Sequence, residues 1–552
     1  MAPRLVTRRL ALLHPAGPRP RCLRSFAIQS RLTTTTNRSR PILPFLFIPG
    51  SSPNSVRRYT SERRRWWKHE AKLVARYTLT LWGVVVCVLT IFFAFNEEVL
   101  EREFPTPPEW HYLTRKFLRD ANNFKDPKNG EINWARALEL SRGVVIRLED
   151  PAIGGQDVVK LSDVVDPQLE VPGEFIACDI SAKSEEWRRG YFEAIMLAAK
   201  AAEHVDGWLR DTTRNIVTPP EFVIGPSNPH PTPIPPGNPS APREEDCEAA
   251  YPSADNWYTK ILATKGLTPR QKVQACLEFA SFLEFKNNSE GADSLYRLAL
   301  AEATSGLDPK KLPYDPRTLV LKERAEAPST NVLDALTATA NHIARKGDVA
   351  SALPIYLSIL KARRSLSDDP PRAAAAPKPK PASFTRQILN FFAPPDYPPP
   401  PPDGTQPPWR SPSERCQEAA LNLYIGEILY ATGSKDEGLA WTRDGVDLAE
   451  EQLRSPKLSK DAREAKSTCR NCLSTGLDNW TVMVSRLARE EKEKKAAGSP
   501  SSMFSFWTGP SQDSESRWEA EEVVIRDRVK RTRELLEDVQ APKPGIVSFF
   551  KA

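Results

Sequence analysis

The chain has 552 residues, which is roughly two or three domains' worth of sequence, and a formal net charge of +7. The charge is unevenly distributed: residues 1–60 contribute +11 and residues 61–76 contribute +4, so residues 77–552 sum to −8. Because this acidic remainder offers no basic face to a phosphate backbone, we expect no nucleic acid among the partners.

Residues 1–60 have the composition of a mitochondrial transit peptide. They contain eleven Arg, no Lys and no Asp or Glu, and Ser and Thr are frequent. Leu5–Leu13 interleaves apolar residues with Arg8 and Arg9, as a basic amphipathic helix does. Arg57–Ser61 resembles a cleavage site of the matrix peptidase. The alternative interpretation is a generic disordered basic tail.

A charge-free run of 19 residues, Tyr77–Phe95, predicts a transmembrane helix. As a helix it would be about 28 Å long, close to the hydrocarbon thickness of a bilayer. The basic stub of residues 61–76 would stay in the matrix, which places the C-terminal part in the intermembrane space. The aromatic residues that suit the headgroup belt are Trp66, Trp67, Tyr77 and Trp82. A buried core helix or a signal-peptide core is the alternative, and a single span excludes a transporter.

Residues 96–255 are predicted to form an N-terminal helical region with a Pro-rich loop. An acidic, proline-containing hinge is expected at Glu98–Pro108, and Thr218–Tyr251 is expected to be an exposed loop. Apolar residues at helical spacing predict the helices Trp110–Asn123, Glu131–Arg142 and Ser184–Asp211, the last with Ser184 as its N-cap. Residues 144–180 have more β-branched residues and turn signals, and the pattern assigns them to no element.

Residues 256–495 contain three predicted helical hairpins with a shared pattern. Counted from Val273, Leu333 and Ala419, apolar residues recur at position 11 in all three and at position 7 in the first and third, and small residues occupy positions 8 and 20, where two helices would cross closely. The small residues are Ala280 with Ala292, Ala340 with Ala352, and Gly426 with Gly438. Turns are predicted at Lys346–Asp348 and Thr432–Ser434. Tetratricopeptide repeats have this pattern, and ordinary helical hairpins are the alternative.

The repeats are not in tandem, because their starts are 60 and 86 residues apart rather than 34. The second insert, Pro370–Pro412, has 15 Pro in 43 residues, a density that favours an extended polyproline II conformation. It is either a spacer or the carrier of a docked segment, Ser383–Phe392. A final helical pair is expected at Ser459–Lys495, and residues 496–552 are a C-terminal extension with a loop and a helix near Glu519–Asp538.

The predicted fold is therefore all-α. A single N-terminal transmembrane helix precedes a degenerate tetratricopeptide-like helical-hairpin solenoid with Pro-rich inserts. Such stacks leave a concave groove that binds peptides and proteins. By repeat position, the groove would be lined by Leu277, Ser281, Glu284, Phe285, Thr337, Asn341, Arg345, Leu423, Glu427 and Tyr430. Asn341 and Arg345 suggest a carboxylate clamp, but the mixed apolar and acidic lining fits unfolded or basic segments better.

No pattern of catalytic, cofactor-binding or metal-ligating residues emerges, so we expect neither an enzyme nor a cofactor. The six His are scattered singly, and the eight Cys have no regular spacing, which disfavours a disulfide-stapled fold. Cys469 and Cys472 form a CxxC pair within a predicted helix, without the strand–helix context of a redox enzyme. We expect the two cysteines to be ordinary structural residues of this helix, and the alternative is a structural disulfide or a redox-sensitive pair.

The arrangement resembles the fungal tetratricopeptide adaptor subunit of the mitochondrial i-AAA protease supercomplex. The resemblance rests on the presequence, the span Tyr77–Phe95, the acidic exit, and repeats at 273–304, 333–365 and 419–451. It implies an inner-membrane protein without hydrolytic activity, which binds unfolded or unassembled membrane proteins and presents them to AAA protease subunits. The Pro-rich inserts and the tail beyond residue 496 depart from the family.

Two other functions remain open from the sequence. One is an assembly factor or chaperone for inner-membrane complexes. The other is an outer-membrane import receptor with cytosolic repeats, although the acid-free presequence argues against it. An enzymatic function depends only on Cys469 and Cys472.

Overall fold

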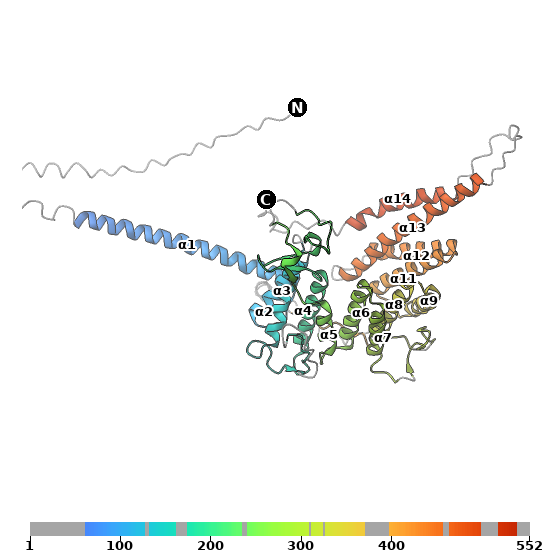
Figure 1. Cartoon of the computed structure of the whole chain (residues 1–552), viewed down its shortest axis with the longest axis horizontal. Coiled ribbons are helices and arrows are strands. Elements are labelled where there is room, and N and C mark those ends of the chain that lie inside the picture. The colour runs from blue at the N-terminus through green and yellow to red at the C-terminus, as the bar shows by residue number, and fades with distance from the viewer. Residues whose placement is uncertain are drawn as a thin grey trace, which may run out of the picture. The chain divides into compact units, whose positions relative to one another are not determined.

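The computed structural model describes residues 61–126, 132–161, 174–234, 240–308, 311–323, 326–369, 397–455, 463–497 and 517–537. The chain divides into two units, Met1–Phe93 and Ala94–Ala552. The described part is 67% helical, with 13 α-helices and few strands (Figure 1). The predicted presequence, its cleavage site and the segment Ser383–Phe392 lie outside the described residues.

Helix α1 (Ser61–Glu103) contains the predicted span Tyr77–Phe95. It is the one helix of the described chain that is long and apolar enough to cross a membrane, and no part of its most apolar stretch is buried. Large apolar side chains along it, such as those of Leu79 and Ile91, are exposed. The length and composition of α1 are those of a membrane-spanning helix.

The predicted hinge at Glu98–Pro108 is wrong in its first half, because α1 remains helical as far as Glu103. Glu97 and Glu101 are buried there by charge pairing and not exposed as an acidic exit. Arg119 of α2 (Tyr112–Lys125) donates to Glu97 at 2.6 Å and also pairs with Glu101. Thr106 donates its hydroxyl to Glu101 at 2.8 Å. These pairs stabilise the helical form of a segment that is acidic and polar.

The N-terminal helical region contains α2, α3 (Trp134–Glu149), α4 (Glu185–His204) and α5 (Ala254–Ala263), which pack in succession. Ser184 accepts a hydrogen bond from the Trp187 N–H, so it is the N-cap of α4 as predicted. Lys260 is fully buried in this core and pairs with Glu149 at 2.6 Å. Tyr191 also donates to Glu149, at 2.9 Å. A buried charge is tolerated here because it has both an ionic partner and hydrogen bonds.

The fold is mostly helical, as predicted, but it also contains two short antiparallel sheets that the all-α prediction did not include. Strands β1 (Val159–Lys160) and β2 (Cys178–Asp179) pair in one. In the other, β3 (Leu209–Asp211) is central between β4 (Ile216–Thr218) and β5 (Cys247–Ala249).

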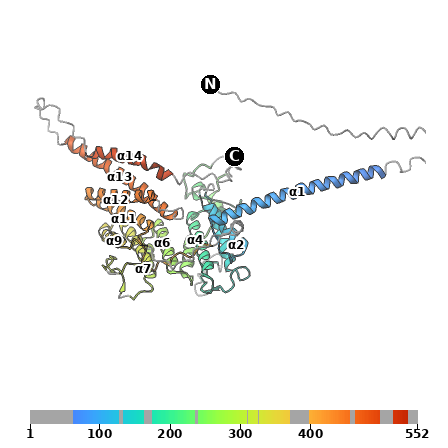
Figure 2. The ribbon, with the colours of Figure 1, turned by 180° about the vertical axis from the view of Figure 1, so that it is seen from behind.

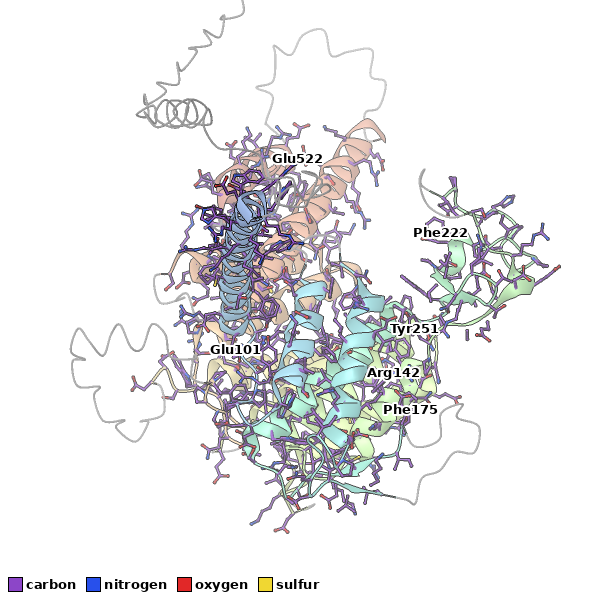
Figure 3. The ribbon with its side chains drawn as sticks, turned by 90° about the vertical axis from the view of Figure 1, so that its left-hand side faces the viewer. Glu101, Arg142, Phe175, Phe222, Tyr251 and Glu522 are labelled. Atoms are coloured by element: carbon purple, nitrogen blue, oxygen red, sulfur yellow. A yellow bond between two sulfur atoms is a disulfide. The ribbon has the colours of Figure 1, made fainter. Side chains whose placement is uncertain are left out.

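The second sheet corrects two sequence-based boundaries. The helix predicted to reach Asp211 ends at His204, because Gly207 has a φ of +75° that breaks the helical path. The region expected to be an exposed loop, Thr218–Tyr251, contains β5 and two short 3₁₀ helices, η3 (Pro220–Phe222) and η4 (Glu244–Asp246). Phe222 lies in this part of the chain (Figure 3).

The repeat region forms three helix pairs. They are α6 (Pro269–Phe285) with α7 (Ser289–Ala303), α8 (Thr330–Arg345) with α9 (Val349–Arg364), and α11 (Pro412–Ala431) with α12 (Lys435–Arg454). The predicted turns are confirmed, since Gly347 and Gly433 have φ of +91° and +104° between the paired helices. Helix α8 packs on α6 and α7, and α11 packs on α9 (Figures 1 and 2).

The helical pair predicted at Ser459–Lys495 is instead one long helix, α13 (Arg463–Ala497). It packs against α11 and α12 on one side and against α14 (Arg517–Glu537) on the other. Leu473, Leu477 and Trp480 are buried in the core that these helices share. The sequence between 459 and 495 has no Pro, and its one Gly, Gly476, lies in close contact with Leu423 and Val446, so nothing interrupts the helix.

The six small residues predicted at helix crossings are all buried. The closest crossing is that of α11 and α12. A Cβ on Gly438 would lie 2.5 Å from the backbone nitrogen of Tyr430 and 2.7 Å from the carbonyl oxygen of Gly426. These are backbone atoms, so no side chain can turn away to make room.

Gly438→Ala is therefore expected to lower the free energy of unfolding by about 3 kcal/mol, because the added methyl group forces α11 and α12 apart. Urea denaturation followed by tryptophan fluorescence measures the effect. Gly306→Ala is the control, since a Cβ there meets no atom within 4 Å. It should change stability by less than about 0.5 kcal/mol. Equal stability of the two variants would contradict the close crossing.

Candidate functional site

The predicted groove residues of the first helix pair lie on α6 and differ in accessibility. Ser281 is exposed, and Phe285, 83% exposed, is the most accessible large apolar side chain on this helix. Leu277 is half-buried and packs against the cores of this region. Glu284 is already bound within the protein, so this face offers only Ser281 and Phe285 to a ligand.

Glu284 belongs to a charge cluster that joins α6, α7 and α8. The imidazole of His342, which is buried, lies between Glu284 and Asp293, with Nε2 at 2.7 Å from Asp293. Arg345 pairs with Glu284 at 2.7 Å, and Lys346 pairs with Asp293 at 2.8 Å. Burial opposes ionisation of Asp293, but the hydrogen bonds from Lys346 and His342 outweigh it and hold its pKa below the usual value.

The carboxylate clamp predicted at Asn341 and Arg345 is occupied by internal partners. Arg345 is paired with Glu284, and the Asn341 side-chain oxygen accepts a hydrogen bond of 2.6 Å from the Tyr356 hydroxyl. Burial raises the pKa of Tyr356 well above its usual value, so the phenol stays protonated as the donor. These two residues therefore stabilise the helix packing, and a chaperone-type carboxylate clamp is not formed by them.

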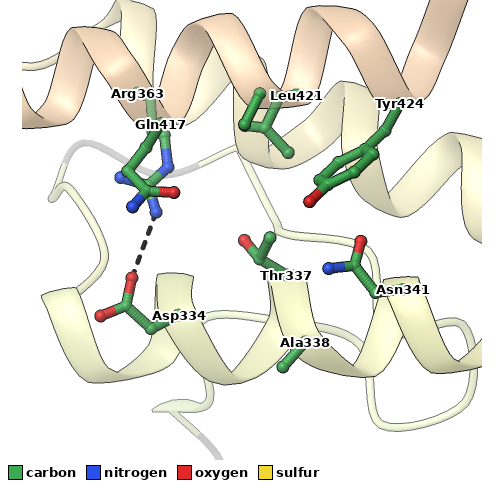
Figure 4. Close-up of a pocket in the computed structure, with 9 residues that line it drawn as sticks. Asp334, Thr337, Ala338, Asn341, Arg363, Gln417, Leu421 and Tyr424 are labelled. Atoms are coloured by element: carbon green, nitrogen blue, oxygen red, sulfur yellow. Dashed lines mark hydrogen bonds and ion pairs between the residues drawn. The ribbon is translucent and has the colours of Figure 1, made fainter. Parts of the chain in front are cut away.

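Two predicted residues, Thr337 and Asn341, line a cleft between α8 and α11 with a volume of about 220 Å³ (Figure 4). Of the two helices in the second pair, α11 packs on α9, which leaves the facing sides of α8 and α11 apart and the cleft between them. The lining also includes residues that repeat position did not select. They are Asp334 and Ala338 from α8, Arg363 from α9, and Gln417, Ala420, Leu421 and Tyr424 from α11.

One end of the cleft is charged. The Arg363 side chain is 2% exposed and pairs with Asp334 at 3.3 Å and with Glu414. Its Nε has no hydrogen-bond partner within the described part of the chain. Burial raises the pKa of Glu414, which the nearby Arg363 guanidinium opposes. This end of the cleft is therefore formed by a buried guanidinium that two carboxylates neutralise.

The other end of the cleft is aromatic. The rings of Tyr356 and Tyr424 lie 5.6 Å apart at an angle of 34°. Tyr424 points into the gap toward Asn341, as Figure 4 shows. Thr337 donates its hydroxyl to the Leu333 carbonyl of its own helix, so its methyl group is left to face the cleft. A short, narrow site with a buried guanidinium at one end and a tyrosine at the other suits an extended peptide segment.

All three predicted groove residues of the third helix pair contact α13 or pack beneath it, although Glu427 stays exposed. Leu423 is only 4% exposed and packs against Gly445 of α12 and Gly476 of α13, so it belongs to the core and does not line a groove. Tyr430 donates to the Met483 carbonyl at 3.1 Å, and Glu427 accepts a hydrogen bond from Asn479. The three positions face the next helix of the stack, which closes the predicted groove at this end.

Sequence reasoning missed Asp334, Arg363, Gln417 and Tyr424. These residues line the cleft because of the orientation of α11 on α9. Repeat counting cannot predict that orientation, because an insert separates the second and third helix pairs. The signal that could have pointed to one of them is the Arg363-Arg364 pair in the last turn of α9. These arginines lie at the end of a partly apolar helix, and the next helix after the insert begins with an acidic turn. Opposite charges at two such helix ends indicate an ion pair between the helices.

The cysteines form a disulfide that the sequence analysis disfavoured. Cys416 of α11 is bonded to Cys469 of α13, 53 residues away. Cys472 is a free, buried thiol, and burial raises its pKa to about 11. The CxxC pair is therefore split between a structural disulfide and an unreactive thiol. No group of three or more metal-ligating side chains occurs among the residues that the structure describes.

Comparison with known proteins adds no assignment. The chain matches no protein-family model, and a search of curated proteins finds no relative.

Proposed function

We propose that this protein is a non-catalytic adaptor of the mitochondrial inner membrane. Its N-terminus would lie in the matrix and its helical body in the intermembrane space, where it would bind unfolded or unassembled membrane proteins and present them to an AAA protease. The observation that carries the proposal is the open cleft between α8 and α11, in a stack of helix pairs that follows an apolar helix.

The helix pairs support a degenerate tetratricopeptide solenoid. Each pair has a short turn, buried small residues at its crossing, and contacts with the next pair. Stacks of this kind bind extended segments of other proteins along the surface formed by their first helices. α6, α8 and α11 are the first helices here, and the cleft lies between two of them.

The disulfide supports the proposed side of the membrane. Cys416 and Cys469 can remain bonded only in a compartment that is more oxidising than the cytosol. The matrix-targeting composition of residues 1–60 and the basic residues before Tyr77 favour export of the following part from the matrix. Together they favour the intermembrane space over the cytosolic face of the outer membrane.

Affinity purification of the tagged protein from mitochondrial membranes in mild detergent tests the proposal. An AAA protease should be recovered in near-stoichiometric amount, together with client membrane proteins. Thr337→Trp fills the cleft and should lower client recovery roughly tenfold, equivalent to about 1.4 kcal/mol of binding, while protease recovery stays unchanged. Ser294→Trp, on the exposed side of α7, which is a second helix outside the cleft, is the matched control.

The same purification distinguishes the two other functions. Recovery of respiratory or translocase subunits without a protease would replace the adaptor with an assembly factor. Digestion of the body by protease added to intact mitochondria would indicate an import receptor on the outer membrane. Unchanged client recovery from Thr337→Trp would exclude the cleft as the binding site.

A further inference from the structure

A proline-rich segment of the chain lies across a second groove, which shares no lining residue with the α8–α11 cleft. This segment, Tyr397–Asp403, has the sequence Tyr-Pro-Pro-Pro-Pro-Pro-Asp and is called the proline strap below. It forms neither helix nor strand, and its proline rings are exposed. Consecutive prolines have no N–H donors and present carbonyl groups along an extended chain.

Arg189 of α4 holds the first part of the proline strap. Its guanidinium donates to the carbonyl oxygens of Pro398 at 2.7 Å and Pro399 at 2.9 Å. The guanidinium carbon also lies 4.2 Å from the centroid of the Tyr397 ring. Arg189 is more than nine-tenths buried. Burial of the Tyr397 side chain raises its pKa to about 12. One arginine thus contacts an aromatic ring and donates hydrogen bonds to two successive main-chain carbonyls.

The N-terminus of α8 holds the other end. The Asn331 side chain donates to the Asp403 carbonyl at 3.0 Å, and its backbone N–H donates to the Gly404 carbonyl at 3.0 Å. Gly404 has a φ of +68°, and a Cβ there would lie 2.1 Å from the Asn331 side chain. The first helical N–H groups are otherwise without partners in their own helix, so Gly404, directly after the strap, satisfies one of them.

The groove beneath the strap is not filled by it. A cavity of about 620 Å³ is lined by α2, α4 and α6 together with the strap. Its apolar lining includes Phe192, Met196 and Leu197 of α4, and its charged lining is mixed, with basic side chains such as Lys125 and Lys200 and the acidic side chains of Glu103, Glu185 and Glu193. The volume falls within the range of peptide and small-ligand sites, and Tyr397 and the prolines of the strap form one wall of the cavity.

The contacts that hold the strap can be exchanged for those of another chain. They involve one tyrosine ring and main-chain carbonyls, which any extended proline-rich segment with an aromatic residue supplies. The Glu193 carboxylate acts on Arg189 through its charge but forms no ion pair with it within 4 Å, so the hydrogen bonds of the guanidinium go to the strap.

We propose that the groove between α2, α4 and α6 is a binding site for an extended, tyrosine-bearing, proline-rich segment of a partner protein, and that the proline strap is its intramolecular competitor. This site is independent of the function proposed above, because it shares no lining residue with the α8–α11 cleft. The strap keeps the site closed to weak ligands, since a tethered segment has a high effective concentration.

The test uses the full-length protein in detergent and a fluorescein-labelled peptide with the sequence of residues 397–404. The opened variant carries Tyr397→Ala, Pro398→Gly and Pro399→Gly, which remove the aromatic contact and the stiffness of the strap. Fluorescence anisotropy should show the peptide bound at least about tenfold more tightly by the opened variant than by the wild type, because the competitor is weakened. Arg189→Ala in the opened variant should abolish that gain.

Two controls separate recognition from misfolding. Arg188→Ala changes the neighbouring arginine, which donates to the Gly266 carbonyl and not to the strap, and should leave peptide binding unchanged. A peptide with Ala in place of its tyrosine should bind the opened variant at least about tenfold more weakly, without any change to the protein. A folded opened variant that binds the peptide no better than the wild type would overturn the proposal. So would a wild-type dimer that the opened variant loses, because the occupant would then be a second copy of this chain.

Discussion

Arg119→Ala is expected to lower the free energy of unfolding of the unit Ala94–Ala552 by about 3–5 kcal/mol. The Arg119 side chain is 4% exposed and lies between Glu97 and Glu101, whose side chains are 10% and 9% exposed. Its removal leaves two buried carboxylates with fewer partners, at Lys116 and Arg115. The last turns of α1 would then lose their fixed position on α2.

Urea denaturation of the purified protein in detergent measures this loss. Arg136→Ala is the matched control, because Arg136 pairs with Glu139 at 3.1 Å on the surface, with both side chains more than half exposed. An exposed pair contributes less than about 1 kcal/mol, so the control should remain close to the wild type. If both variants unfold at the same urea concentration as the wild type, the Arg119 cluster does not stabilise the end of α1.

Removal of the Cys416–Cys469 disulfide is expected to cost about 4 kcal/mol of stability in the chain-entropy estimate, because the bond closes a loop of 53 residues. The double variant Cys416→Ala, Cys469→Ala is preferred to a single one. Cys472 lies beside Cys416, with its sulfur 3.7 Å from the Cys416 carbonyl, and could form a new bond with a lone partner.

Reduction provides an independent check of the same bond. Dithiothreitol should lower the urea midpoint of the wild type to that of the double variant and leave the double variant unchanged. Cys247→Ala, at a half-buried free thiol, should retain the full response to reductant. A wild type whose midpoint does not move on reduction, or that has the same number of reactive thiols before and after it, would show that the disulfide does not form in solution.

Local signals in the sequence predicted most of the helices correctly. The N-cap Ser184, the turns at Gly347 and Gly433, and the apolar run Tyr77–Phe95 depend on neighbouring residues alone. Small residues at helix crossings also followed from spacing, since the helical period brings positions such as Gly426 and Gly438 together. Helix ends were less accurate where a distant partner changed them, as at Glu101 beside Arg119.

The candidate site could be predicted only in part. Thr337 and Asn341 line the cleft, but Leu423 is in the core because α13 covers it. The strand β5 was missed because its partner β3 lies more than thirty residues earlier in the chain. Cys469 pairs with Cys416 and not with Cys472, because residues three apart in one helix cannot compete with a thiol presented by the facing helix.

The sequence by itself determined that this protein is mostly helical, with one apolar helix near its N-terminus and paired helices after it, because helix period, capping and hydropathy act over a few residues. Only the tertiary structure decided which faces remain open. The α8–α11 cleft, the disulfide and the contact of Arg189 with Tyr397, 208 residues apart, all depend on how the helices pack. Contacts between residues that distant leave no periodic pattern in the chain, so no local pattern could reveal them.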